Sequence, residues 1–126
     1  MNLLLKENYS DTRDNIVEIL KPFEFGITCI KSIGQSNEEV WNNGSVYDMV
    51  IADLEIDDNE SRYFIKKAKN GDHTPVILLS DLIEKRDRII VKELGVNAVF
   101  EKPFDIFALK HEVQRLIRPK ENFSNL

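Results

Sequence analysis

The sequence lacks what a disulfide bond, a membrane span or a signal peptide would need. Its 126 residues include one cysteine, Cys29, and a lone thiol is typical of a reducing compartment. No apolar run approaches the ~18 residues that a membrane-spanning helix needs. The leucines at positions 3–5 are followed at once by charge, so this apolar segment is too short for a signal peptide. We therefore expect a cytoplasmic protein without membrane contacts.

An excess of basic charge is also absent. The 17 Lys and Arg are outnumbered by 22 Asp and Glu, which gives a formal net charge of −5. Nucleic-acid backbones are held by basic surfaces, so we expect no direct binding to nucleic acid. With 42% apolar and 31% charged residues, the composition is typical of a globular protein. The length favours one domain, which we place at residues 1–118, followed by a polar tail at 119–126.

Two kinds of segment alternate along the chain. Short apolar runs predict strands at residues 3–5, 27–30, 47–53, 75–80 and 98–100. Segments with helical spacing or capping signals predict helices at about 12–22, 36–43, 60–70, 84–94 and 105–117. Apolar residues at consecutive strand positions are typical of strands covered on both faces. We therefore predict an α/β fold, a doubly wound five-stranded parallel sheet with the flavodoxin-like order 2-1-3-4-5 and five helices.

Single positions within these elements can be predicted as well. The helix over 84–94 is expected to turn Ile89, Ile90 and Leu94 toward the core. Cys29 lies within an apolar strand, and we expect it to be a small core residue rather than a nucleophile.

Polar side chains stand where four of the predicted strands end. Glu7 and Asn8 follow the first strand, Asp53 ends the third, Ser80 ends the fourth, and Lys102 follows the fifth. In a parallel sheet of this order, the working crevice lies beyond the carboxyl ends of the strands. The sequence therefore predicts that these five residues meet at one edge of the sheet.

This combination of groups suits the transfer of a phosphoryl group to a carboxylate. Asp53 would be the nucleophile, while Ser80 would hydrogen-bond one phosphoryl oxygen and Lys102 would hold an ammonium group against another. Mg²⁺ requires near-octahedral oxygen ligands and keeps several waters. Glu7, Asn8, Asp53 and a backbone carbonyl would be sufficient to bind it.

The segments that carry these residues resemble the receiver domains of bacterial two-component response regulators. They are Leu3–Asn8, Asp48–Asp53, Thr74–Ser80 and Leu94–Phe104. The resemblance extends over about residues 2–118, with the motifs in the family's order and spacing. It implies a signalling domain rather than an enzyme, with Mg²⁺ as cofactor and a cis bond between Lys102 and Pro103. It also implies a histidine kinase or phosphotransfer protein as phosphoryl donor, a downstream protein partner, and a possible homodimer through the fourth helix, fifth strand and fifth helix.

The sequence departs from the family pattern at several positions. Receiver domains carry a pair of acidic residues after the first strand, and Asn8 replaces the second of them, so we predict weaker binding of Mg²⁺. Glu55 would compensate for the lost charge if its side chain points the same way as that of Asp53. Asp81 stands where a small residue usually admits the phosphoryl donor, and it is either a helix cap or a gate. The switch position holds Val99 instead of an aromatic residue, so an inward aromatic swing is not expected.

Two other functions remain open at this stage. The departures favour a degenerate receiver that acts as an interaction module without phosphorylation. Haloacid-dehalogenase-like phosphatases also combine an Asp nucleophile with Ser or Thr and Lys on successive strands. Those enzymes carry Asp-x-Asp on an early strand and usually a cap domain, whereas Asp53 lies on the third predicted strand and the chain has no spare length.

Overall fold

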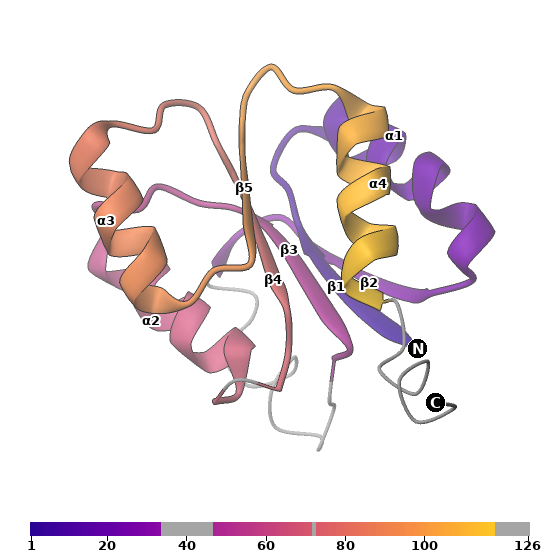
Figure 1. Ribbon diagram of the computed structural model, residues 1–126. Helices are drawn as coiled ribbons and strands as arrows, with labels where there is room; N and C mark the ends of the chain where they lie inside the picture. Colours follow the sequence, from indigo (N-terminus) through magenta and orange to yellow (C-terminus); the bar gives the residue numbers. More distant parts are fainter. Residues whose placement is uncertain (34–46, 72, 118–126) are drawn as a thin grey trace, which may run out of the picture.

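The computed structural model describes residues 1–33, 47–71 and 73–117. Its strands form one parallel sheet in the order β2-β1-β3-β4-β5 (Figure 1). They are β1 (Asn2–Lys6), β2 (Gly26–Ile30), β3 (Met49–Asp53), β4 (Val76–Ser80) and β5 (Ala98–Glu101). The predicted fold class and strand order are confirmed.

Helices cover both faces of this sheet (Figure 1). They are α1 (Ser10–Leu20), α2 (Asn59–Lys69), α3 (Lys85–Leu94) and α4 (Ile106–Ile117), with a short 3₁₀ helix η1 (Lys21–Phe23) after α1. Helices α1 and α4 lie on one face, and α2 and α3 lie on the other. The helix predicted at 36–43 and the tail at 119–126 fall outside the described residues.

The inner strands are buried because helices lie on both sides of them. Leu3, Leu4 and Leu5 of β1 have no exposed surface. Leu3 and Leu5 pack with α1 and α4, whereas Leu4 packs with α2 and α3, as the alternation of a strand requires. Burial of each such side chain is worth about 1.5–3 kcal/mol. The strands therefore form a firmly packed frame that holds the residues after them at one edge.

The starts of two helices are capped by acidic side chains, and one of these caps corrects a prediction. Asp105 caps α4, because its Oδ1 accepts a hydrogen bond of 2.9 Å from the backbone N–H of Phe107. Helix α3 is capped by Glu84, whose side chain accepts from the backbone at Asp87 while Asp87 accepts from the backbone N–H of Glu84 at 2.9 Å. Asp81 is therefore not the cap of this helix, and the cap interpretation of Asp81 was wrong.

Two predicted core positions are exposed. Ile89 is 60% exposed, because the residues of α3 that face the core are Val91 and Asp87, with Ile90 and Leu94 partly buried beside them. Cys29 is also exposed, because β2 lies at the edge of the sheet and, among the strands within the described ranges, pairs with β1 alone. None of the helices in the three described ranges is both long enough and apolar enough to cross a membrane.

Candidate functional site

Three of the predicted residues meet at the carboxyl edge of the sheet. Lys102 directly follows β5, and its backbone N–H donates to the carbonyl of Ser80. The peptide bond between Lys102 and Pro103 is cis, as the resemblance implies. The Nζ atom of Lys102 donates to both carboxylate oxygens of Glu7, at 2.8 and 3.1 Å, and to Oδ2 of Asp53 at 3.2 Å. One ammonium group therefore joins the ends of β1, β3 and β5.

Burial sets the electrostatics of this cluster. The side chain of Glu7 has no exposed surface, and those of Lys102 and Asp53 are 13% and 14% exposed. Burial raises the pKa of Glu7 and outweighs the hydrogen bond from Lys102, which lowers it. Burial alone would lower the pKa of Lys102, but the hydrogen bond to Glu7 and the charge of Asp53 together raise it. Lys102 is therefore held as a cation beside Asp53.

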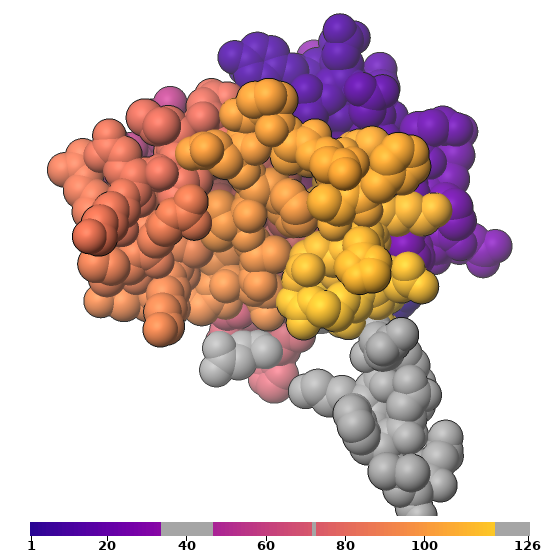
Figure 2. Space-filling view, turned by 45° about the horizontal axis from the view of Figure 1, so that its top comes forward, coloured from indigo at the N-terminus to yellow at the C-terminus, as the bar shows by residue number. Residues whose placement is uncertain are grey.

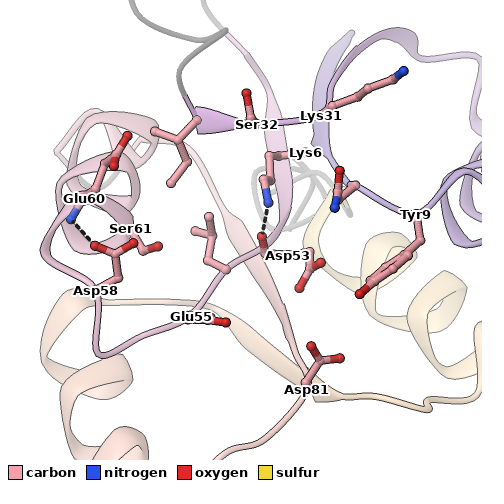
Figure 3. A pocket seen from close by; sticks show the side chains of 13 residues that line it. Lys6, Tyr9, Lys31, Ser32, Asp53, Glu55, Asp58, Glu60, Ser61 and Asp81 are labelled. Carbon is pink, nitrogen blue, oxygen red and sulfur yellow. Dashed lines mark hydrogen bonds between the residues drawn. The ribbon is translucent and has the colours of Figure 1, made fainter.

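A cavity of about 450 Å³ opens beside Asp53 (Figure 3). Asn8 and Glu55, both predicted metal ligands, are exposed and line this cavity together with Asp53 and Asp81. Their amide and carboxylate oxygens have the chemistry that Mg²⁺ prefers. Among the described residues, however, no three His, Cys, Asp or Glu side chains lie close enough together to hold a metal ion. The acidic donors are present in one cavity, but no three of them form a ready cluster, so a metal ion here would also need Asn8 or water as ligands.

Ser80 lies at the predicted strand end, but its hydroxyl is bonded to a backbone carbonyl of the following loop. The side chain is buried, and Oγ donates to the carbonyl of Leu82 at 3.3 Å. Ser80 lines a smaller hollow that shares Glu55 and Asp81 with the cavity beside Asp53. The structure therefore brings Ser80 to the predicted edge of the sheet, with its hydroxyl bonded to the carbonyl of Leu82.

Val99, the predicted switch position, is half-buried on β5 and packs against the core on the side of α2 and α3. Its neighbour Phe100 faces the other side and lies 5.7 Å from the ring of Phe104, centroid to centroid. The next residue, Glu101, accepts a hydrogen bond of 2.8 Å from the backbone N–H of Ile83. Glu101 thus ties β5 to the loop that follows β4.

Sequence reasoning missed two residues of this site. Lys6 donates from Nζ to the backbone carbonyl of Asp53 at 2.8 Å, and Tyr9 lies with its ring centroid 5.2 Å from Nζ of Lys102. Both side chains line the cavity (Figure 3). A lysine directly after three leucines at the end of a strand was a usable signal, because alternation sends Lys6 to the same side as Leu4. Nothing in the sequence marked Tyr9.

Known proteins resemble the whole of this chain, although no protein-family model matches it. The response regulator protein GraR of Staphylococcus saprophyticus is 26% identical over 125 residues, which cover 98% of this chain and 54% of GraR. The regulatory protein VirG of Agrobacterium tumefaciens is 25% identical over 121 residues, covering 94% of this chain and 45% of VirG. The chain thus spans about half the length of the curated relatives that it matches.

Solved structures have the same fold. The orphan response regulator HP1043 of H. pylori superposes with a TM-score of 0.77 at 22% identity, covering 94% of this chain and 97% of HP1043. A signal receiver domain from Clostridium thermocellum gives a TM-score of 0.80 at 15% identity, covering 94% and 98%. Taken with the curated relatives and with the strand order of the sheet, these similarities support the interpretation of the chain as a response regulator receiver domain.

Proposed function

We propose that this receiver domain accepts a phosphoryl group on Asp53 and signals through contacts with other proteins. The observation that carries the proposal is the distance of 3.2 Å between Nζ of Lys102 and Oδ2 of Asp53 at the carboxyl edge of the sheet. A fixed ammonium group at this place stabilises negative charge that develops on a phosphoryl oxygen. It acts in a largely buried position, where electrostatic stabilisation is stronger than in water.

The proposed donor is the phosphohistidine of a histidine kinase or of a phosphotransfer protein. A carboxylate oxygen of Asp53 forms a bond to phosphorus while the bond between phosphorus and the donor's imidazole nitrogen breaks. The electron pair of the broken bond stays on the imidazole nitrogen, and Lys102 keeps its proton throughout. Ser80 would join only after its hydroxyl leaves the carbonyl of Leu82 and turns toward the new phosphoryl oxygens.

A groove beside Lys102 gives the donor protein a route to Asp53. A groove of about 710 Å³ runs between α1 and the start of α4, where Ile19, Phe104 and Ile106 supply apolar surface next to Lys102. Asp81 lines both this groove and the cavity beside Asp53. We propose that a helical donor protein docks in this groove with its phosphohistidine directed at Asp53, and that Asp81 stands at the entrance as a gate.

Mg²⁺ is the cofactor that receiver domains generally use. We propose that Asp53, Asn8 and Glu55 would hold it here, and that it would neutralise phosphoryl oxygens during transfer. Both carboxylate oxygens of Glu7 accept hydrogen bonds from Lys102, and Asn8 carries no charge. These observations support weak binding.

The output surface would be the face formed by α3, β5 and α4 (Figure 2). Ile89 of α3 and Phe107 of α4 are 60% and 67% exposed on helices that flank β5. Exposed apolar side chains of this size suit contact with another protein. We propose this face for the downstream partner, or for a second copy of the chain in a homodimer.

A direct test is the intact mass after incubation with acetyl phosphate and Mg²⁺. Wild type should gain the mass of one phosphoryl group, and Asp53→Asn should gain none. Asp57→Asn is a matched control, because it removes an exposed carboxylate from the same loop and should be modified like wild type. An unmodified wild type at a large excess of donor would overturn the proposal. Turnover of a simple phosphate ester would favour a phosphatase instead.

A second function is favoured by the state of the site. Lys102 lies closer to Glu7 than to Asp53, and Ser80 is engaged with Leu82. An atypical orphan response regulator with a phosphorylation-independent regulatory mechanism has a similar fold, with a TM-score of 0.75 at 22% identity and coverage of 94% and 96%. The alternative proposal is an interaction module that works without phosphate. Saturable Mg²⁺ binding near millimolar concentration would count against it.

A further inference from the structure

Asp53 lies between two ammonium groups. Lys102 contacts its carboxylate at 3.2 Å. Lys6 donates to its backbone carbonyl at 2.8 Å (Figure 3). Lys6 is the last residue of β1, directly after three leucines with no exposed surface, and it is itself half-buried. An ammonium group in such a position loses part of its hydration, so it needs compensation from the groups around it.

The charges near Lys6 supply that compensation. The charged side chains that line the cavity are Lys6 and Lys31 and the acidic residues Asp53, Glu55, Asp58, Glu60 and Asp81. Next to Asp53, Lys102 forms ion pairs with the carboxylates of Glu7 and Asp53, and Lys6 donates to the backbone carbonyl of Asp53. Two lysines of the chain thus already place positive charge next to Asp53, where a divalent cation would otherwise supply it.

The same lysine disfavours a metal ion. Mg²⁺ demands oxygen ligands in near-octahedral geometry, and the backbone carbonyl of Asp53 already uses one of its two lone pairs to accept a hydrogen bond from the ammonium of Lys6. A fixed positive charge in the cavity also repels a divalent cation. An incoming phosphoryl group, by contrast, is an anion and is attracted by it.

We propose that Lys6 is a positioning residue that acts as a resident cation of the Asp53 cavity. It fixes the end of β3, weakens the binding of Mg²⁺, and attracts the anionic phosphoryl group. The last part rests on the proposed phosphorylation of Asp53. The effect on Mg²⁺ does not depend on it, so the two can be tested separately.

The test compares Lys6→Gln, which removes the charge but keeps a hydrogen-bond donor, with Lys6→Arg, which keeps the charge. Mg²⁺ alone is titrated into each protein and followed by NMR shifts of the Asn8 and Asp53 amides. Lys6→Gln should bind Mg²⁺ more tightly than wild type, on the order of tenfold. Lys6→Arg should bind it like wild type, and so should Lys66→Gln, which removes a positive charge from the exposed side of α2.

A second arm uses acetyl phosphate in the presence of a chelator. Without metal, Lys6→Gln should be phosphorylated several times more slowly than wild type, since the attracting charge is gone. Urea unfolding of each variant verifies that it is folded. If Lys6→Gln and wild type bind Mg²⁺ equally, the proposal for Lys6 is overturned whether or not Asp53 is phosphorylated. If every variant resists phosphorylation but Lys6→Gln binds Mg²⁺ more tightly, the proposed function fails and the role of Lys6 toward the metal stands.

Discussion

Lys102 lies closer to Glu7 than to Asp53, with Nζ 2.8 Å from Oε1 of Glu7 and 3.2 Å from Oδ2 of Asp53. Glu7 is fully buried, so its charge depends on this one cation. The same ammonium group thus neutralises a buried acid and stands next to the proposed phosphoryl acceptor. Stability and the proposed function therefore depend on the same side chain.

Removal of Lys102 should therefore destabilise the fold strongly. Lys102→Met leaves Glu7 buried without its cation, and we expect a loss of about 3 kcal/mol in the free energy of unfolding. Adding Glu7→Gln to Lys102→Met should recover part of that loss, because the buried charge is then gone. Urea unfolding of the single and double variants measures both effects.

An exposed ion pair supplies the control. Lys21 lies 2.7 Å from Glu18, with both side chains about two-thirds exposed, so Lys21→Met should cost less than about 1 kcal/mol. Equal losses for Lys21→Met and Lys102→Met would contradict the account of the buried pair.

The titration of Glu7 should make the free energy of unfolding depend on pH. The fold raises the pKa of Glu7 above 4.5, so the folded state binds this proton more tightly than the unfolded chain does. The stability that this group contributes is complete below pH 4.5 and is lost as the pH rises through the folded pKa. Wild type should therefore lose stability relative to Glu7→Gln as the pH rises from about 4 toward 7. Urea unfolding of both proteins across this range gives the difference, and a constant difference would refute the prediction.

Tyr9 should restrict access to Lys102. Its ring lies 5.2 Å from the ammonium group, yet the residue is 58% exposed, so Tyr9→Ala should cost only about 0.5–1 kcal/mol. We expect faster phosphorylation by acetyl phosphate, because the variant uncovers the ammonium group. Tyr63→Ala is a matched control, since Tyr63 makes a similar contact with Lys67 at 5.9 Å on α2. A phosphorylation rate raised equally in both variants would show that the ring of Tyr9 is not the cause.

Substitution of Glu84 should affect stability, whereas substitution of Asp81 should affect the rate of phosphorylation. Glu84 caps α3, so Glu84→Ala should lose about 1 kcal/mol of stability. Asp81 is exposed and lines the cavity, so Asp81→Ala should change stability by less than about 0.5 kcal/mol. Phosphorylation of Asp81→Ala should be faster than that of wild type, because a negative charge at the entrance repels the donor. A stability loss equal to that of Glu84→Ala would restore the cap interpretation of Asp81.

Much of the fold was predictable because burial on both faces leaves consecutive apolar residues in a strand. Those runs located the strands, and the rule that parallel strands end at one edge brought Glu7, Asp53 and Lys102 together correctly. The direction of the Ser80 hydroxyl was not predictable, because it is set by the nearby carbonyl of Leu82. Lys6 was passed over because a lysine at a strand end commonly lies in solvent, and only the structure shows its contact with Asp53.

The central claim is that Asp53 becomes an acyl phosphate, and reductive trapping tests it at the level of one residue. The protein is treated with acetyl phosphate and Mg²⁺, reduced with borohydride, which converts an aspartyl phosphate to homoserine, and then mapped by peptide mass spectrometry. We predict homoserine at position 53 in wild type and in Asp57→Asn. Homoserine at another position, or at none under a large excess of donor, would contradict the account.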